Sequence, residues 1–137
     1  MSYHQAVENC KNIFGNNSLG KIFEPKDAFI ADKVLTDSLT QLLQDELNPH
    51  IWIGVHDKTN KSFFSYELGG SLHFENWFQN ETTADKSGES CVQAIHSIEA
   101  KWKVMPCTGY DVPSVCERLI EKGILHFLSR TASSIKT

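Results

Sequence analysis

The chain of 137 residues lacks any apolar run long enough to cross a membrane. A spanning helix needs about 18 consecutive apolar residues, and no stretch approaches that length. Basic residues are not in excess either: the formal net charge of −4 argues against a nucleic-acid partner. A polar, helix-like segment follows Met1 at once, so we expect no signal peptide, which leaves the compartment undecided. The length suits a single domain over residues 1–137.

The motifs of common enzymes and metal sites are also missing. There is no G-x-S-x-G nucleophile motif, no phosphate-binding loop and no H-E-x-x-H zinc motif. Six scattered histidines are present: His4, His50, His56, His73, His96 and His126. Isolated histidines have many uses, so we expect neither catalysis nor a metal site from them.

Four cysteines restrict the environment of the chain. They are Cys10, Cys91, Cys107 and Cys116. No pair has the C-x-x-C spacing of a zinc or redox site, and an even number at wide spacing favours two disulfides in an oxidising compartment. Three pairings are possible, and four free thiols in a cytosolic protein are the alternative. Three N-glycosylation sequons, at Asn16, Asn60 and Asn80, add modest support for secretion.

Hydrophobic periodicity predicts two helices followed by short strands. Apolar residues at three-to-four spacing predict helices over residues 3–14 and 27–47. Short β-rich runs follow at residues 51–55, 62–66, 90–95, 101–105 and 114–120. The polar segment over residues 75–90 has no periodicity and predicts a long irregular loop, which is usually functional in a compact domain. The pattern is that of an α+β fold.

An ordered set of short motifs resembles the C-type lectin-like domain family, in its long-loop form. The motifs are Trp52-Ile53-Gly54, Gly69-Gly70, Asn76-Trp77, Glu89-Ser90-Cys91-Val92, Lys101-Trp102 with Cys107, and Val115-Cys116-Glu117. The match covers almost the whole chain. It implies two helices and two small antiparallel sheets with a long loop, and a packed core around the three tryptophans. It also implies the disulfides Cys10–Cys116 and Cys91–Cys107, each worth about 3 kcal/mol if it restricts the unfolded chain.

The order of the strands departs from that family. Its members open with a strand upstream of the first helix, whereas here residues 1–117 run from the first helix to the last family strand. Residues 118–137 supply a turn and a run at 123–130 that looks like the missing strand. We therefore expect a hairpin of residues 115–120 and 124–129, and a circular permutation of the domain. The alternative is that the tail is an unrelated extension.

The loop triplet that holds calcium in sugar-binding members is degraded here. It falls on Glu81-Thr82-Thr83, where members have a proline in the middle. Thr82 replaces that cis proline, and a cis bond before a non-proline residue costs about 3 kcal/mol. Glu81 and Glu89 keep carboxylates, whereas Lys103 and Val104 stand where two oxygen ligands are expected.

The auxiliary calcium site of the family is degraded in the same way. Asp57 matches a ligand, but Lys61 and Ala84 replace acidic residues. We therefore expect no bound calcium and no other cofactor, with Asp57, Glu81 and Glu89 as degenerate calcium positions. The alternative is a reshaped acidic site of Glu81, Asp85 and Glu89.

The resemblance implies an extracellular ligand-recognition module, not an enzyme. We expect it to bind a protein or an atypical glycan without calcium, through the long-loop face. The candidate residues are Phe78, Glu81, Thr83, Asp85, Glu89 and Lys103. Alternatives are a carbohydrate-binding lectin with a divergent site near Glu81, Glu89 and Lys103, and an engineered, rearranged scaffold without selected activity. The sequence gives no oligomeric state.

Overall fold

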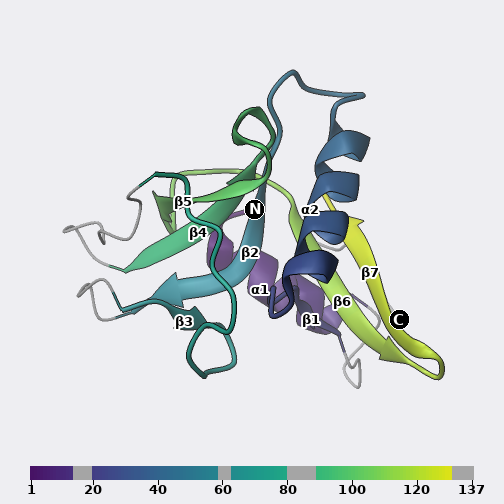
Figure 1. Ribbon diagram of the computed structural model, residues 1–137. Helices are drawn as coiled ribbons and strands as arrows, with labels where there is room; N and C mark the ends of the chain where they lie inside the picture. The colour runs from purple at the N-terminus through teal and green to yellow at the C-terminus, as the bar shows by residue number, and fades with distance from the viewer. Residues whose placement is uncertain (14–19, 59–62, 80–88, 131–137) are drawn as a thin grey trace.

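The computed structural model describes residues 1–13, 20–58, 63–79 and 89–130 (Figure 1). Within them lie the helices α1 (Tyr3–Asn12) and α2 (Ala28–Leu42) and the short 3-10 helix η1 (His96–Ile98). The strands are β1 (Gly20–Ile22), β2 (His50–Asp57), β3 (Ser65–Tyr66), β4 (Ser90–Ile95), β5 (Lys101–Pro106), β6 (Ser114–Ile120) and β7 (Gly123–Ser129). The predicted α+β class is confirmed.

The strands form one mixed sheet built from two antiparallel groups. Strands β1, β6 and β7 make one group, and β2 to β5 make the other. A parallel pairing of Trp52 with Ser114 joins them into a seven-stranded sheet. The two small antiparallel sheets expected from the sequence are therefore continuous through this one pairing.

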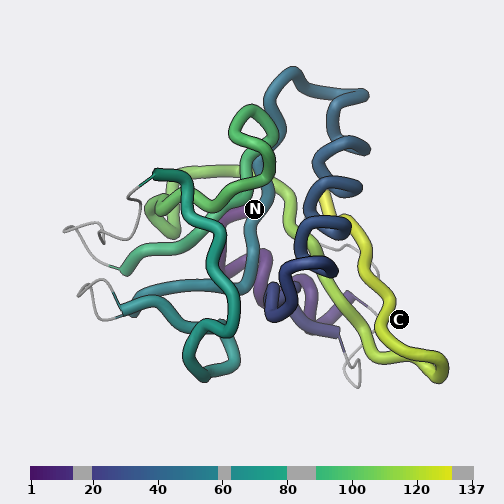
Figure 2. Tube along the Cα trace, viewed as in Figure 1, coloured from purple at the N-terminus to yellow at the C-terminus, as the bar shows by residue number. Residues whose placement is uncertain are grey.

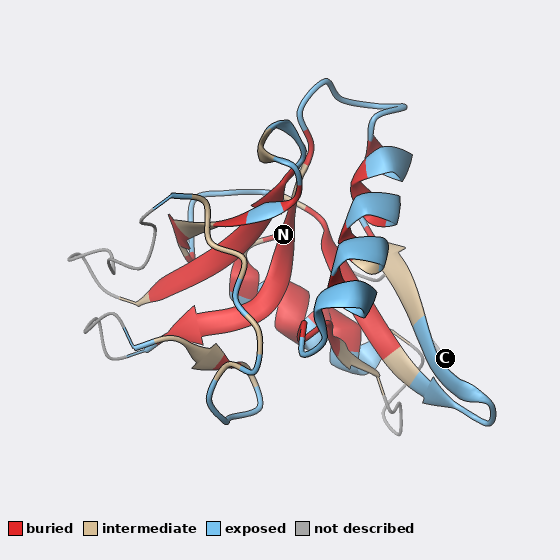
Figure 3. Ribbon diagram, in the orientation of Figure 1, coloured by how far each residue is buried: buried red, intermediate tan, exposed pale blue. Residues whose placement is uncertain are grey.

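The two helices cover opposite faces of the sheet, as alternation along β2 shows. Ile51 and Ile53 belong to the core under α2, whereas Trp52 between them packs with α1. Side chains on both faces of β2 are buried, so this strand runs through the middle of the molecule (Figure 3). The predicted core role of Trp52 and Trp102 is confirmed, since both are fully buried.

Local hydrogen bonds fix where each helix begins. Ser2 and Gln5 form a capping box at α1, in which each side chain accepts the other residue's backbone N–H. Asp27 caps α2 by accepting the N–H of Ile30 at 2.9 Å. Helix α2 ends at Leu42, five residues before the predicted end, because the sequence beyond it forms turns and leaves Leu47 almost fully exposed.

Both disulfides expected from the family resemblance are present. Cys10–Cys116 ties α1 to β6, and Cys91–Cys107 ties β4 to the residue after β5. The alternative of four free thiols is therefore excluded for this structure.

The predicted hairpin at the end of the chain is confirmed as well. Strands β6 and β7 pair antiparallel from Ser114–Ser129 to Ile120–Gly123, and the hairpin projects from the sheet on the side of α2 (Figure 2). Strand β1, which pairs with the opposite edge of β6, was not predicted because its three residues carry no readable alternation. That the hairpin results from a circular permutation stays a prediction.

Candidate functional site

The two described ends of the long loop are held against β5 and the second disulfide. The N–H of Phe78 donates to the carbonyl of Trp102 at 2.9 Å, and the N–H of Trp102 donates to the carbonyl of Asn76 at 2.9 Å. At the other end, the carbonyl oxygen of Glu89 lies 3.5 Å from Cys107 Sγ. The loop therefore begins and ends on a rigid frame.

An aromatic cluster supports the first of these ends. The rings of Trp77 and Trp102 meet edge to face at 5.3 Å between centroids, and Phe74 meets Trp102 at 5.7 Å. Phe64 packs on Trp77 at 5.0 Å. Edge-to-face contacts of this kind add to the burial of apolar area, so the segment that carries Phe78 is firmly positioned.

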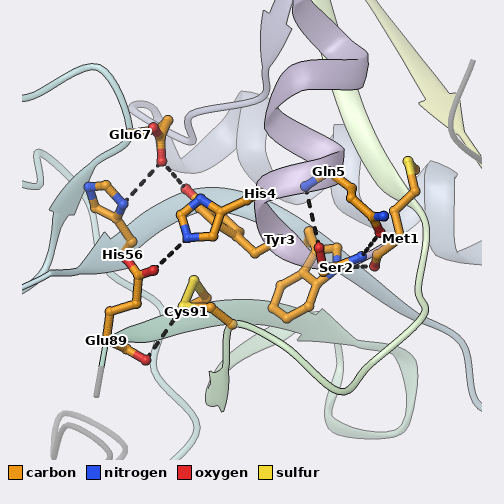
Figure 4. Close-up of a disulfide and its surroundings, with 11 residues drawn as sticks. Met1, Ser2, Tyr3, His4, Gln5, His56, Glu67, Glu89 and Cys91 are labelled. Carbon is orange, nitrogen blue, oxygen red and sulfur yellow. Dashed lines mark hydrogen bonds and ion pairs between the residues drawn. A yellow bond between two sulfur atoms is a disulfide. The ribbon is translucent and has the colours of Figure 1, made fainter.

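The second end of the loop contacts α1 through a short hydrogen bond between His4 and Glu89. His4 Nε2 lies 2.5 Å from Glu89 Oε1 (Figure 4). The neighbouring Tyr3 donates its backbone N–H to the carbonyl of Cys107 at 3.1 Å. The first turn of α1 thus contacts both the disulfide and the acid that precedes β4.

Behind this contact lies a polar cluster of Tyr3, His56 and Glu67, of which Tyr3 and His56 are buried and Glu67 is partly buried. The Tyr3 hydroxyl donates to Glu67 Oε1 at 2.6 Å, and His56 Nδ1 lies 3.0 Å from the same oxygen (Figure 4). Tyr3 is fully buried and His56 nearly so. One carboxylate therefore connects the helix α1 to β2 and to the turn after β3.

The burial and pairing of this cluster shift two pKa values in opposite directions. Burial raises the pKa of the Tyr3 hydroxyl well above its usual range, and the carboxylate of Glu67 raises it further. Burial alone would raise the pKa of Glu67, but its contacts with His56 and Tyr3 outweigh that effect and hold the pKa below its ordinary value. The cluster is stable with a neutral tyrosine and an ionised glutamate.

The structure places three of the six candidate binding residues. Phe78 is half-buried, and its backbone N–H donates to the carbonyl of Trp102. Because Lys103 follows Trp102, Phe78 and Lys103 lie at the same edge of the sheet. Lys103 pairs with Gln93, whereas Glu89 precedes β4 and contacts α1. Both Lys103 and Glu89 are described, and no ion pair joins them. The other candidates, Glu81, Thr83 and Asp85, lie outside the described residues, as do the three sequons.

The degenerate calcium positions are engaged within the protein where they are described. The Asp57 carboxylate is fully buried and accepts the N–H of Phe63 at 3.1 Å. Glu89 is paired with His4, and Val104 pairs with Val92 in the sheet. Lys61, Thr82 and Ala84 lie outside the described residues.

One group of possible metal ligands occurs in the described part of the chain. Ligand atoms of His4, Glu89 and Cys107 lie within 4.8 Å of one another. Zinc is held by thiolate sulfur, and the Cys107 sulfur is bonded to Cys91 instead. One imidazole and one carboxylate remain, which is short of the usual four-ligand zinc set.

This fold and these disulfides agree with a comparison at the level of sequence families. The profile described as "Lectin C-type domain" matches residues 1–118. The chain belongs to the C-type lectin domain family.

Individual relatives of this lectin domain are distant and mostly larger. Echinoidin of Heliocidaris crassispina is 26% identical over 74 residues, which is 54% of this chain and 50% of echinoidin. The human versican core protein is 34% identical over 68 residues, 49% of this chain and 2% of versican. Collectin-43 of Bos taurus is 26% identical over 109 residues, 77% of this chain and 30% of the collectin. The chain spans half or less of each of these proteins.

Solved structures share the fold over most of the lectin domain. The C-type lectin CEL-I from Cucumaria echinata superimposes with a TM-score of 0.63 at 14% identity, covering 93% of this chain and 81% of CEL-I. Human lithostathine gives 0.60 at 16% identity, covering 96% and 77%. Such low identities establish the fold alone.

The sequence did not predict the contacts of His4, His56 and Glu67 near the second end of the long loop. His4 and His56 stood alone in the sequence, and Glu67 carried no motif. Helix geometry could have indicated this cluster. At a rise of 1.5 Å per residue, α1 extends about 10 Å from Cys10, which is fixed to Cys116, toward its N-terminus. That is far enough for Tyr3 and His4 to reach the second disulfide.

Proposed function

We propose that this lectin domain is an extracellular recognition module that binds its ligand without calcium, through the long-loop face. The ligand is a protein or an atypical glycan, and the domain acts by binding, not by catalysis. Two disulfides and three sequons support an oxidising, extracellular location and glycosylation.

The observation that carries the proposal is the pairing of Glu89 with His4. A calcium ion needs six to eight oxygen ligands, and the sequence leaves few carboxylates in register with the family's sites. Of those, Glu89 is paired with a histidine at 2.5 Å and Asp57 is buried and bonded to the Phe63 backbone. An ion at either site would have to compete with these contacts for the carboxylate oxygens.

The side chains near the loop suit contact with a protein surface. Phe63 is 73% exposed and Leu68 is 60% exposed, on the segments that flank β3. Phe63 lines a surface hollow together with Lys58, and exposed apolar side chains beside a charged one are typical of recognition surfaces. The proposal also includes the loop residues Glu81, Thr83 and Asp85, which lie outside the described residues.

Binding with and without a chelator tests this function. The domain is applied to a glycan array and to a panel of cell-surface proteins, in calcium and in EDTA. We expect binding that persists in EDTA and is weakened by Phe78→Ala or Lys103→Ala, but not by Leu119→Ala at the distant hairpin. Binding to simple sugars that disappears in EDTA and returns with calcium would instead support the alternative of a sugar-binding lectin.

We also propose that the chain is a circular permutant, with β7 as the relocated first strand. The full antiparallel pairing of β6 and β7 supports this. A variant with residues 121–137 moved ahead of Met1 should then form the same two disulfides and melt cooperatively. Loss of folding in that variant would contradict the permutation without affecting the proposed function.

A further inference from the structure

A groove at the opposite end of the domain from the long loop is a candidate second binding site. It lies between the first turns of α2 and the β6–β7 hairpin, with a volume of about 630 Å³. Strands β3 and β4 lie on the other side of the molecule (Figure 1). Ligand sites usually fall between about 300 and 1,000 Å³, so the groove is of ligand size.

The walls of this groove are apolar. Phe23 and His126 form part of the floor, with their rings edge to face at 5.2 Å between centroids. Ile30 from α2 and Ile124 from β7 line the sides and are each about half exposed, at 47% and 54%. An aliphatic or aromatic body would bury this surface on binding.

A buried carboxylate faces this apolar groove. Glu117 lines it, although the residue is only 8% exposed. In the described part of the chain its side chain makes one hydrogen bond: Oε1 accepts the backbone N–H of Glu24 at 3.3 Å. A buried carboxylate with a single, long hydrogen bond is poorly compensated for its loss of water.

The other charged groups of the groove already have partners. Lys21 and Lys26 lie 3.0 and 3.5 Å from the buried carboxylate of Glu24. Asp27 caps α2, and Lys33 lies 3.5 Å from Asp37. Lys21 and Lys26 thus share one carboxylate, whereas Glu117 is buried and has no ion pair among the described residues, so it is the group that a cationic ligand would complement.

We propose that this groove binds a small amphipathic organic cation, with an ammonium or guanidinium group on Glu117 and an apolar body between Ile30 and Ile124. The site goes beyond the proposed function, because it uses no residue of the long-loop face. A charge-assisted hydrogen bond in a partly buried site gives selectivity for a cation over a neutral or anionic molecule of the same length.

Three probes with the same alkyl chain separate binding of a cation from binding of a neutral or an anionic molecule. Octylammonium, octanol and octanoate are each titrated into the whole domain, and binding is followed by calorimetry and by NMR shifts of β7 amides. We expect octylammonium to bind most tightly. Glu117→Gln keeps an acceptor for the Glu24 N–H but removes the charge, and should weaken octylammonium about tenfold or more. Glu121→Gln, which removes the same charge at the exposed turn of this hairpin, should change binding less than twofold, within about 0.4 kcal/mol.

A second variant keeps the test valid if Glu117→Gln does not fold. Ile124→Lys places a cation on a half-exposed wall position and should also weaken octylammonium. The proposal is overturned if octanoate binds as tightly as octylammonium, which would assign the site to the lysines. It is also overturned if no probe binds, or if Glu117→Gln binds octylammonium as the unaltered domain does.

Discussion

Tyr3 is the residue at which α1, the second disulfide and the carboxylate of Glu67 meet. Its backbone bonds to Cys107 and its hydroxyl bonds to Glu67, while its ring packs edge to face on Trp52 at 5.7 Å. The side chain is fully buried and neutral, so its ionisation and that of Glu67 link the stability of the loop base to pH.

Tyr3 should limit stability in alkali. The unfolded chain ionises tyrosine near the ordinary pKa of 10.0, whereas the folded chain keeps Tyr3 neutral because its pKa is raised. Its contribution is therefore complete below pH 10 and is lost as pH rises above it. Tyr3→Phe should cost about 1 kcal/mol at neutral pH through the lost hydrogen bond. It should also flatten the decline above pH 10, as measured by urea denaturation.

The exposed Tyr110→Phe variant is the control for that experiment. It should leave both the neutral stability and the alkaline decline unchanged. An alkaline decline that is equally steep in Tyr3→Phe and in the unaltered domain would show that Tyr3 is not buried as described.

Glu67 should act on the acid side. Its pKa is lowered in the folded chain from the ordinary value of 4.5, so its stabilisation is complete above that value and is lost as pH falls through the folded pKa. Glu67→Gln should therefore lower the free energy of unfolding at neutral pH and reduce its dependence on pH below 4.5. The exposed Glu75→Gln is the control, and a Glu67→Gln variant with the full acid dependence would contradict the assignment.

At the scale of elements, Gly54 sets how closely β2 approaches the segment after β1. Its N–H donates to the carbonyl of Phe23 at 2.8 Å. A Cβ at this position would lie 3.0 Å from that carbonyl oxygen and 3.0 Å from side-chain carbons of Ile22 and Glu24. The glycine of the Trp52-Ile53-Gly54 motif is thus required by packing.

Gly54→Ala should destabilise the domain by about 1–3 kcal/mol, because a backbone oxygen cannot move aside without shifting β1. Chemical denaturation measures the loss, and amide exchange of β1 and Phe23 should accelerate. An alanine variant as stable as the unaltered domain would mean that the two segments are further apart than the structure has them.

The elements also show what the sequence could and could not predict. Helix α1 and strands β4 and β6 followed from periodicity and β-rich runs, whereas the terminal hairpin followed from the family resemblance together with the glycine-containing turn. Strand β1 did not, since three residues carry no alternation, and α2 was predicted too long because Leu43 and Leu47 continue the leucine pattern without reaching the core. For the site, motif register identified Glu89 and Lys103. The pairing of Glu89 with His4 could not be predicted, because 85 residues separate them and only the fold brings them together.

At the scale of the whole molecule, the two ends of the domain have different chemistry. One end holds the two described ends of the long loop on aromatic rings and a disulfide, with the Glu67 carboxylate behind them. The other end carries an apolar groove with a buried carboxylate. The tip of the hairpin beside it is exposed (Figure 3). No described helix is long and apolar enough to cross a membrane. We propose that these two ends bind different ligands.

The most direct test of the central claim is the melting temperature in calcium and in EDTA. An ion bound at one hundred times its dissociation constant would stabilise the domain by about 2.7 kcal/mol, a rise of several degrees. We predict the same melting temperature in millimolar calcium as in EDTA, and a rise of several degrees that titrates with calcium and disappears in Glu89→Gln would contradict the account.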